Sequence, residues 1–283
     1  MKIYTCVTNM PFRVCNSRGR SRCPTRAAVM AGTGVHAGRC GRSRFVPSEF
    51  IFFLLIFVRN YQTNPYMKIT DFSTQHTILN QFLSELRDVT IQQDSLRFRR
   101  NIERIGEIMA YEISRDLPYV EKAIRTPLAE ATENVPAVRP IIATILRAGL
   151  PLHRGFINYF DHAENAFVSA YRKYFDEDHF DIHIEYIASP KLDGKTLILT
   201  DTMLATGASM EYAYEALLTK GMPAHIHIAS VIASRQAVEH IRQVFPQEKT
   251  SLWCGTIDPE LNAHSYIVPG LGDAGDLCYG EKE

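Results

Sequence analysis

The amino-acid sequence predicts an α/β fold in which helices flank a mostly parallel β-sheet. Residues 140–146 form a continuous apolar run of strand length, which is typical of a parallel strand buried on both faces. Between this run and residue 257, expected strands alternate with expected helices. The strands are short segments that are apolar or alternate between apolar and polar residues, and the helices are longer segments with a helical period. Such alternation favours a parallel sheet, and proteins with such sheets bind their ligands at the carboxyl ends of the strands.

Charge divides the chain into two unlike parts. The 283 residues contain 31 basic and 31 acidic side chains. Residues 1–66 hold ten of the basic side chains and one of the acidic ones, so their net charge is +9 and that of the remainder is −9. A change of this size usually marks a boundary between unlike segments. The negative charge of the second part disfavours nucleic acid as its partner.

The first 66 residues lack the pattern of a folded domain. Arginines are scattered among Gly, Ser and Cys without a regular period, and the nine apolar residues at 50–58 are too few to span a membrane. An arginine-rich, acid-poor leader is also compatible with an organelle transit peptide. We expect residues 1–66 to be a basic extension, disordered or not made in the cell. The working domain is then expected to span residues 67–283.

Two amphipathic helices and an outer strand are expected before residue 140. The first helix, capped by Asp71 or Ser73, carries an apolar face of Leu79, Phe82, Leu83 and Leu86. The second helix, over residues 96–113, alternates arginines with acidic residues. We therefore expect a solvated face there rather than a nucleic-acid site. Residues 119–128 alternate loosely, as an outer strand would.

The remaining elements follow in a regular order. After the strand at 140–146 we expect a helix at 150–160, a strand at 166–171, a polar and mobile hairpin at 173–188 and a strand at 195–200. A helix at 209–220, a strand at 225–233, a helix at 234–245 capped by its own Ser234, and a strand at 250–257 complete the series. His225 and His227 are expected on the exposed face of their strand, and Cys254 in the core.

Residues 197–209, Leu-Ile-Leu-Thr-Asp-Thr-Met-Leu-Ala-Thr-Gly-Ala-Ser, join a strand to a helix through a short loop. Free N–H groups and the helix dipole make such a loop an anion site. The loop has no Lys before Ser209 and only one Gly, so it is neither a Walker A motif nor a dinucleotide fingerprint. With Asp201 in front of it, the loop suits a sugar phosphate. An ordinary strand–turn–helix connection is the alternative.

Two arginines and a glycine-rich tail add to this candidate site. Arg147 and Arg172 each follow an expected strand, as Asp201 does, so all three should lie at one edge of the sheet. Residues 266–276, Tyr-Ile-Val-Pro-Gly-Leu-Gly-Asp-Ala-Gly-Asp, combine glycines with two carboxylates. Glycine lets the backbone approach a flat ligand closely, so this tail is a second binding segment unless it is a surface turn.

These segments resemble four motifs of the uracil phosphoribosyltransferase family, in the family's order and over residues 70–282. The loop at 201–209 is similar to the phosphoribosyl-pyrophosphate motif of that family, and residues 145–150 are similar to its pyrophosphate loop. Tyr171 and Arg172 match the pair before its flexible hairpin. Residues 266–276 are similar to its uracil-binding hood.

The resemblance implies a type I phosphoribosyltransferase-like fold with a flexible β-hairpin arm and a small C-terminal hood. It implies transfer of the phosphoribosyl group of 5-phosphoribosyl 1-diphosphate (PRPP) to uracil, giving UMP and diphosphate in pyrimidine salvage. The catalytic residues that it implies are Asp201, Arg172 and Asp273. For PRPP it implies Arg147, Arg172, Asp201, Thr202, Met203, Leu204, Ala205, Thr206, Gly207, Ala208, Ser209 and Asp273, and for uracil Ile267, Gly272, Asp273 and Ala274.

The resemblance also bears on cofactors, partners and location. It implies Mg²⁺ carried by PRPP without a direct protein ligand, a homo-oligomer, a GTP effector as in some members of the family, and a cytoplasmic protein without a membrane or nucleic-acid partner. The alternative is a regulator that keeps the fold, senses PRPP or UMP and catalyses little.

Five residues depart from the family pattern. Thr202 stands where Pro is usual, Ala208 where Gly is usual, Pro151 where Gly is common, Leu277 where a basic residue is usual and Tyr279 where Phe is usual. Ala208 needs a negative φ, because a positive φ would cost about 1 kcal/mol. None of the five removes a charged group that contacts a ligand, so activity is expected.

Overall fold

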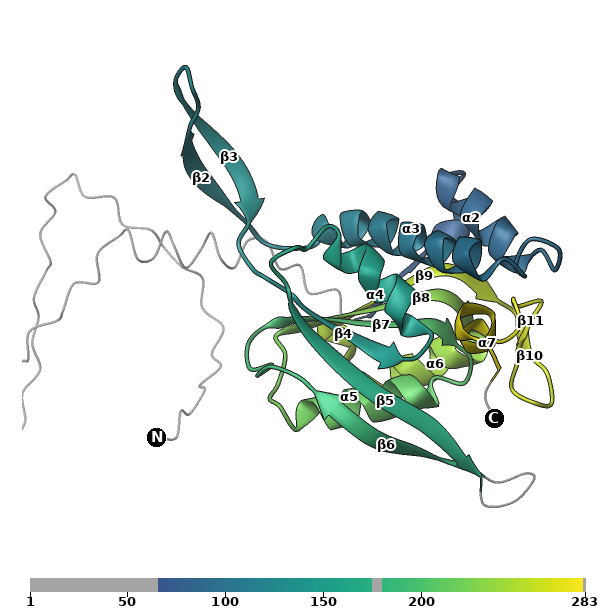
Figure 1. The fold of residues 1–283 in the computed structure, drawn as a ribbon. Helices are drawn as coiled ribbons and strands as arrows, with labels where there is room; N and C mark the ends of the chain where they lie inside the picture. Colours follow the sequence, from purple (N-terminus) through teal and green to yellow (C-terminus); the bar gives the residue numbers. More distant parts are fainter. Residues whose placement is uncertain (1–65, 175–179, 282–283) are drawn as a thin grey trace, which may run out of the picture. The chain divides into compact units, whose positions relative to one another are not determined.

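The computed structural model describes residues 66–174 and 180–281, and it describes the backbone alone for residues 170–174 and 180–185. These residues belong to the unit Asn60–Glu283. The predicted α/β architecture is confirmed. A seven-stranded sheet has the order β1-β9-β8-β7-β4-β5-β6, in which neighbouring strands are parallel except β5 and β6 (Figure 1). Its strands are β1 (Lys68–Asp71), β4 (Ile141–Leu146), β5 (Glu164–Tyr174), β6 (Phe180–Ala188), β7 (Thr196–Leu204), β8 (His225–Ser234) and β9 (Thr250–Asp258).

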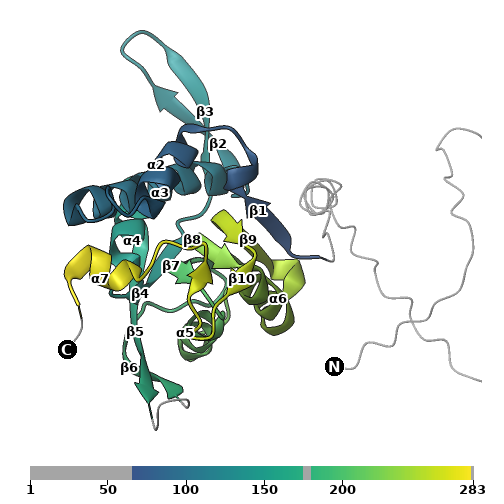
Figure 2. The same cartoon turned by 90° about the vertical axis from the view of Figure 1, so that its right-hand side faces the viewer.

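Helices cover both faces of this sheet (Figure 2). On one face, α2 (Ile78–Arg87), α3 (Ser95–Ser114) and α4 (Gly149–Ile157) pack in one apolar cluster with Ile142 of β4 and Ile198 of β7. On the other face, α5 (Ala208–Leu218) and α6 (Arg235–Val244) pack against Leu197 and Leu199 of β7. Strands β4, β7 and β8 are therefore buried almost throughout, as central strands of a parallel sheet are.

The C-terminal segment forms the small unit that the sequence predicts as a hood. It consists of β10 (Glu260–Leu261) paired antiparallel with β11 (Ile267–Val268), followed by the short helix α7 (Ala274–Tyr279). Ile267, Leu271 and Ala274 are buried in the same cluster as α2 and α3. We call residues 260–280 the hood below.

A hairpin of β2 (Tyr119–Arg125) and β3 (Glu130–Pro136) projects from the body of the domain (Figures 1 and 2). The expectation of an outer strand at 119–128 is corrected, because β2 pairs with β3 in a separate two-stranded sheet. All seven residues of β2 are exposed, and Leu128 in the connecting turn is 97% exposed. The loose alternation of this segment therefore does not mark a face that packs on the core.

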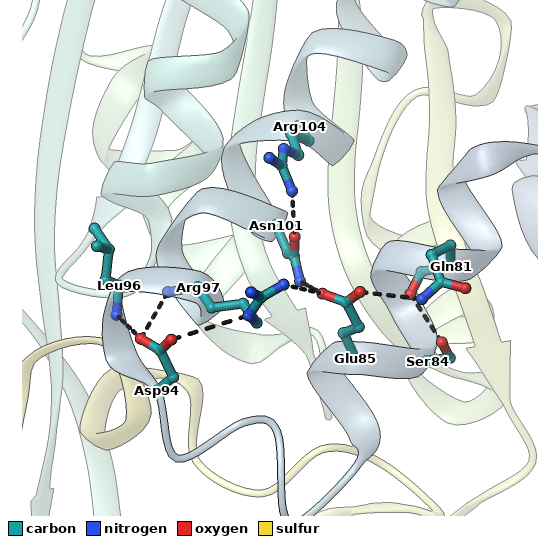
Figure 3. Close-up of polar contacts among 8 residues, drawn as sticks. All are labelled: Gln81, Ser84, Glu85, Asp94, Leu96, Arg97, Asn101 and Arg104. Carbon is teal, nitrogen blue, oxygen red and sulfur yellow. Dashed lines mark hydrogen bonds and ion pairs between the residues drawn. The ribbon is translucent and has the colours of Figure 1, made fainter.

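The arginines of α3 are paired within the protein, as their alternation with acidic residues predicts. Figure 3 shows Glu85 of α2 at the centre of this network. Its carboxylate accepts hydrogen bonds from Gln81 (3.0 Å), Asn101 (2.7 Å) and Arg97 (3.3 Å). These contacts, with that of Gln81 the largest, hold the pKa of Glu85 below its ordinary value. The network ties α2 to α3 through their polar faces.

Several element boundaries differ from the expectations. The strand β1 was not expected, because four residues at a sheet edge carry little periodic signal. Asp71 caps the short 3₁₀ helix η1 (Phe72–Thr74) rather than α2, whose N-cap is Thr77. Ser234 does cap α6, through a hydrogen bond from the Ala237 N–H group (2.9 Å). A second 3₁₀ helix, η2 (Gln247–Lys249), leads into β9.

The expected exposure of His225 and His227 is wrong. His227 is 1% exposed, and its Nδ1 accepts a hydrogen bond from Trp253 Nε1 at 3.2 Å. His225 is partly buried, with its Nε2 3.1 Å from Ser251 Oγ. Strand β8 is covered on both faces, so its alternation does not separate a core face from a solvent face. Burial lowers the pKa of both imidazoles.

No helix among the residues that the structure describes is long and apolar enough to cross a membrane.

Candidate active site

Asp201 lies near the carboxyl end of β7, which is flanked by β4 and β8 at the centre of the sheet. The expected strand ended at residue 200, but β7 continues to Leu204, so Asp201 is held by strand pairing with Ser230. Burial raises the pKa of Asp201 to about 7, although the N–H groups of Thr202 and Met203 act in the opposite direction. The Thr202 N–H group lies 2.7 Å from Asp201 Oδ1. This carboxyl group therefore changes its charge near neutral pH.

The loop after β7 forms the start of α5, as the sequence predicts. Gly207 is the N-cap of α5 with a φ of +89°, and a Cβ at this position would lie 2.8 Å from His240 Cδ2 of α6. Both the backbone and the space around it therefore require glycine. Ala208 is the first residue of the helix and has the negative φ that it needs. The N–H groups of this first turn lie at the helix end, which is the arrangement that the predicted anion site requires.

Arg147 connects the end of β4 to the hood. Its Nη2 donates hydrogen bonds to Asp276 Oδ1 (3.3 Å) and to the carbonyl oxygen of Gly280 (3.2 Å). The tertiary structure thus places the predicted pyrophosphate-binding arginine against the predicted uracil-binding segment. The side chain is 39% exposed, so much of its charge remains open to solvent and to a ligand.

The hood carries its site residues on a capped helix beside the β7 loop. Asp273 caps α7, because its Oδ1 accepts hydrogen bonds from the N–H groups of Gly275 (2.7 Å) and Asp276 (3.1 Å). The N–H group of Ala274 points at Met203 Sδ of β7, 3.5 Å away. Residues 203 and 274 are 71 positions apart in the sequence and meet at this site.

Two buried side-chain atoms in the described part of the chain lack a hydrogen-bond partner, Arg147 Nε and Thr202 Oγ1. Both belong to residues that the sequence predicts as PRPP-binding. Buried polar groups are normally paired, and an unpaired one often marks a ligand site.

The site residues assemble as follows. The structure brings Met203 of the loop at 201–209 against Ala274 of the hood, and it brings Arg147 against Asp276. Arg172 lies inside β5 rather than after its end, because the strand continues to Tyr174. The side chain of Arg172 lies outside the described residues, as do residues 175–179 at the tip of the hairpin predicted to be mobile.

Sequence reasoning missed an ion pair behind the hood, between Arg87 of α2 and Asp258 of β9. The Arg87 Nη2 and Asp258 Oδ1 atoms are 2.7 Å apart. The signal for Asp258 was present, because it is an acidic residue at the carboxyl end of an expected strand, like Asp201. The signal for Arg87 was absent, because its partner lies 171 residues away.

Among the described residues outside this site, Cys254, Cys278 and His153 are buried. Burial raises the pKa of the Cys278 thiol to about 12, and Cys254 is fully buried, so neither thiol is activated as a nucleophile. His153 is buried, with its Nε2 2.9 Å from Asn165 Oδ1. Within the described ranges, no three His, Cys, Asp or Glu side chains are grouped so that they could hold a metal ion.

The fold and the site define an α/β protein in which Asp201, the start of α5 and a C-terminal hood lie near the carboxyl end of β7. A model of the uracil phosphoribosyltransferase family matches residues 73–281. The chain therefore belongs to the uracil phosphoribosyltransferase family.

Individual relatives and a solved structure agree with this assignment. The chain is 63% identical over 216 residues to a uracil phosphoribosyltransferase of Porphyromonas gingivalis, covering 76% of this chain and 100% of that protein. It is 40% identical to the one of Methanothermobacter thermautotrophicus, over 66% of this chain and 85% of that protein. The structure of the AQ2163 protein from Aquifex aeolicus matches with a TM-score of 0.67 and 28% identity, over 75% of this chain and 98% of that one.

Proposed function

We propose that this chain is a pyrimidine-salvage enzyme, which transfers the phosphoribosyl group of PRPP to uracil and releases UMP and diphosphate. The observation that carries the proposal is the 63% identity to a protein named for this activity, over the whole length of that protein. The grouping of Asp201, the α5 start and the hood at one edge of the sheet supports it.

The PRPP end of the reaction is assigned to β7 and the loop after it. The amides of residues 204–209, with the hydroxyls of Thr206 and Ser209, bind the 5-phosphate at the positive end of α5. Asp201 accepts hydrogen bonds from the ribose hydroxyls. Its negative charge also stabilises the positive charge that grows on the sugar as the bond to diphosphate breaks. Displacement of diphosphate by the uracil ring nitrogen therefore needs Asp201 in its ionised form.

Diphosphate binding is assigned to Arg147 and Arg172. Arg147 now contacts Asp276 and Gly280, and diphosphate offers stronger charge-assisted acceptors than a carbonyl oxygen does. Arg172 belongs to the β5–β6 hairpin and adds charge that stabilises the leaving group. Closure of this hairpin keeps out water, which would otherwise hydrolyse the activated sugar.

Uracil recognition is assigned to the backbone of the hood. One edge of uracil presents a carbonyl, an N–H group and a second carbonyl, so its binding site must offer donor, acceptor and donor. The carbonyl oxygen of Ile267 and the N–H groups of Gly272 and Ala274 supply this order. Cytosine would leave one of these buried groups unpaired, and so would be rejected by orders of magnitude.

Mg²⁺ fits this site as a companion of PRPP. Mg²⁺ prefers oxygen ligands, substrate phosphates and retained waters, so it needs no direct protein ligand here. When bound, the ion neutralises charge on the diphosphate. Asp273 would hold it through water, because one of its oxygens already caps α7.

The remaining proposals concern the partners of the protein, its location and the residues that its activity needs. We infer a cytoplasmic homo-oligomer with GTP as an effector, and the exposed β2–β3 hairpin offers a surface for a second copy. We also infer that residues 1–66 are not needed for activity. The match of 216 residues to the whole P. gingivalis relative supports this. No observation favours the regulator that keeps the fold and catalyses little.

A single assay tests the enzyme proposal. Diphosphate release is measured with PRPP, Mg²⁺ and either uracil or cytosine. Release that depends on uracil and not on cytosine is expected. If neither base stimulates release at millimolar concentration, the proposed activity is rejected.

A further inference from the structure

The ion pair between Arg87 and Asp258 joins two elements that lie behind the hood. Arg87 is the last residue of α2, and Asp258 is the last residue of β9. The guanidinium group meets the carboxylate in two parallel contacts, Nη1 to Oδ2 at 3.0 Å and Nη2 to Oδ1 at 2.7 Å. Their side chains are 25% and 6% exposed, so the pair is largely removed from water.

Both members of the pair bind the backbone of one hood residue, Gly270. Arg87 Nη1 donates to the Gly270 carbonyl oxygen at 3.2 Å, and the Gly270 N–H group donates to Asp258 Oδ2 at 2.9 Å. The donor and the acceptor of this residue are thus held at the same time. Gly270 has a φ of +63°, and a Cβ on it would lie 2.0 Å from the Ile267 carbonyl oxygen. The turn from Ile267 to Gly270 is therefore closed tightly against the pair.

Stability alone explains such a pair poorly. Removing two charges from water costs several kcal/mol per ion, and apolar residues in their place are often no less stable. What a bidentate, fully hydrogen-bonded pair provides is a defined geometry. Here the pair fixes the position of Gly270, which lies in the turn between Ile267 and Gly272. The backbone groups of Ile267 and Gly272 are among those assigned to uracil. Backbone groups have no rotamers, so only the path of the chain can place them.

We propose that Arg87 and Asp258 are positioning residues for base recognition, because they hold Gly270 so that the flanking backbone groups match the edge of uracil. The inference rests on the proposed function. It assigns specificity for the base to two side chains that do not touch the base themselves.

The test uses the full chain with Asp258→Asn and Arg87→Lys, which keep approximate size and remove one charge or the bidentate geometry. We expect the KM for uracil to rise about tenfold or more in each variant, while the KM for PRPP stays nearly constant. The matched control is Arg97→Lys, because Arg97 makes an ion pair with Glu85 of α2 at 3.3 Å and its ion pairs, with Glu85 and Asp94, lie outside the hood. Its two KM values should equal those of the wild type.

A second measurement does not depend on activity. Hydrogen exchange of the peptide covering residues 266–277, without substrates, should be faster by about tenfold at Gly270 in Asp258→Asn, and unchanged in Arg97→Lys. Unchanged exchange in this peptide overturns the positioning role even if the enzyme is active. A fall in kcat with constant KM for uracil also overturns it, because it indicates loss of folded protein only. An inactive wild type rejects the proposed function instead, and the exchange result still decides the role of the pair in holding the turn.

Discussion

Burial and hydrogen bonds act in opposite directions on the pKa of the Asp201 carboxyl group. Burial raises its pKa to about 7, and the N–H groups of Thr202 and Met203 lower it. In an unfolded chain the pKa of the same group is about 3.9. The folded protein without substrate therefore keeps the proton to a higher pH than the unfolded chain does. Ionisation of Asp201 therefore lowers the stability of the folded protein.

The first prediction concerns stability. Between about pH 4 and pH 7, Asp201 binds more protons in the folded state than in the unfolded state. The contribution of Asp201 to the free energy of unfolding therefore falls as the pH rises across that window. Asp201→Asn removes the ionisation and keeps the acceptor for the Thr202 N–H group. The variant should be more stable than the wild type, and this difference should be larger at pH 8 than at pH 5 by on the order of 2 kcal/mol. Thermal melting at both pH values measures it, and an equal difference at both would contradict the assigned pKa.

The second prediction concerns the rate of the same variant. Asp201→Asn should reduce turnover by about 10²-fold or more, because the negative charge opposite the developing cation is lost. In the wild type, kcat/KM for PRPP should rise with pH up to about 7 as Asp201 ionises. Steady-state assays of diphosphate release across pH 5.5–8.5 measure both effects. An unaffected rate in the variant would remove the role given to Asp201.

The third prediction compares two adjacent residues of the phosphate loop. Gly207→Ala places a Cβ on a left-handed residue and 2.8 Å from His240 Cδ2, so it should cost about 1–2 kcal/mol of stability and raise the KM for PRPP. Ala208→Gly should cost about 0.5–1 kcal/mol and leave the kinetics unchanged, because Ala208 already has helical backbone. Denaturant titration and initial rates of both variants measure this. If Ala208→Gly instead increases activity, the departure from the family pattern at residue 208 is harmful.

At the scale of elements, the hood is attached to the body by side chains from three separate places. Arg87 of α2 binds the Gly270 carbonyl oxygen, Arg99 of α3 binds that of Cys278, and Arg147 after β4 binds that of Gly280. The short helix α7 also depends on its cap, because six residues are too few to be stable in isolation. The hood thus owes its position to contacts with residues far away in the sequence.

The fourth prediction separates the two roles of Asp273 within this element. Asp273→Asn keeps the cap and removes the charge, and Asp273→Ala removes both. We expect Asn to retain the wild-type KM for uracil while its turnover falls, because the water-mediated contact with Mg²⁺ and PRPP loses its charge. Ala should also raise the KM for uracil and lower stability by about 1 kcal/mol. Steady-state kinetics with melting curves measure both variants, and identical behaviour of the two would contradict a separate role for the charge.

At the scale of the whole molecule, the site depends on one sheet with helices on both faces. The phosphate loop joins the sheet to α5 on one face, while the hood packs with α2 and α3 on the other. Met203, near the carboxyl end of β7, lies against Ala274 of the hood. Under the proposed assignments, the sugar phosphate and the base belong to these two parts of the fold.

The fifth prediction concerns the extent of the working protein. A variant that begins at Met67 should have the same kcat and KM values as the full chain, because the sheet, both helical layers and the hood lie after that residue. Its melting temperature should also be unchanged. Loss of activity in the shortened variant, with a retained fold by circular dichroism, would show that residues 1–66 take part in the reaction.

The sequence by itself determined the sheet strands β4, β7, β8 and β9, the helices between them and the four motifs of the site. These features depend on the local periodicity of apolar residues and on short motifs. Both can be read from neighbouring residues without knowing how the chain folds. The prediction of a buried strand at 140–146 and of an anion-binding loop before Ser209 rests on such local patterns.

Only the tertiary structure decided which side chains meet across the molecule. It paired β2 with β3 away from the main sheet, buried His227 beneath Trp253, turned Arg147 towards the hood and placed Arg87 against Asp258 and Gly270. The physical reason is that these contacts join residues that are distant in sequence, or depend on which face a second layer covers. No local period records either property, so packing alone determines how the hood is held against the loop at 201–209.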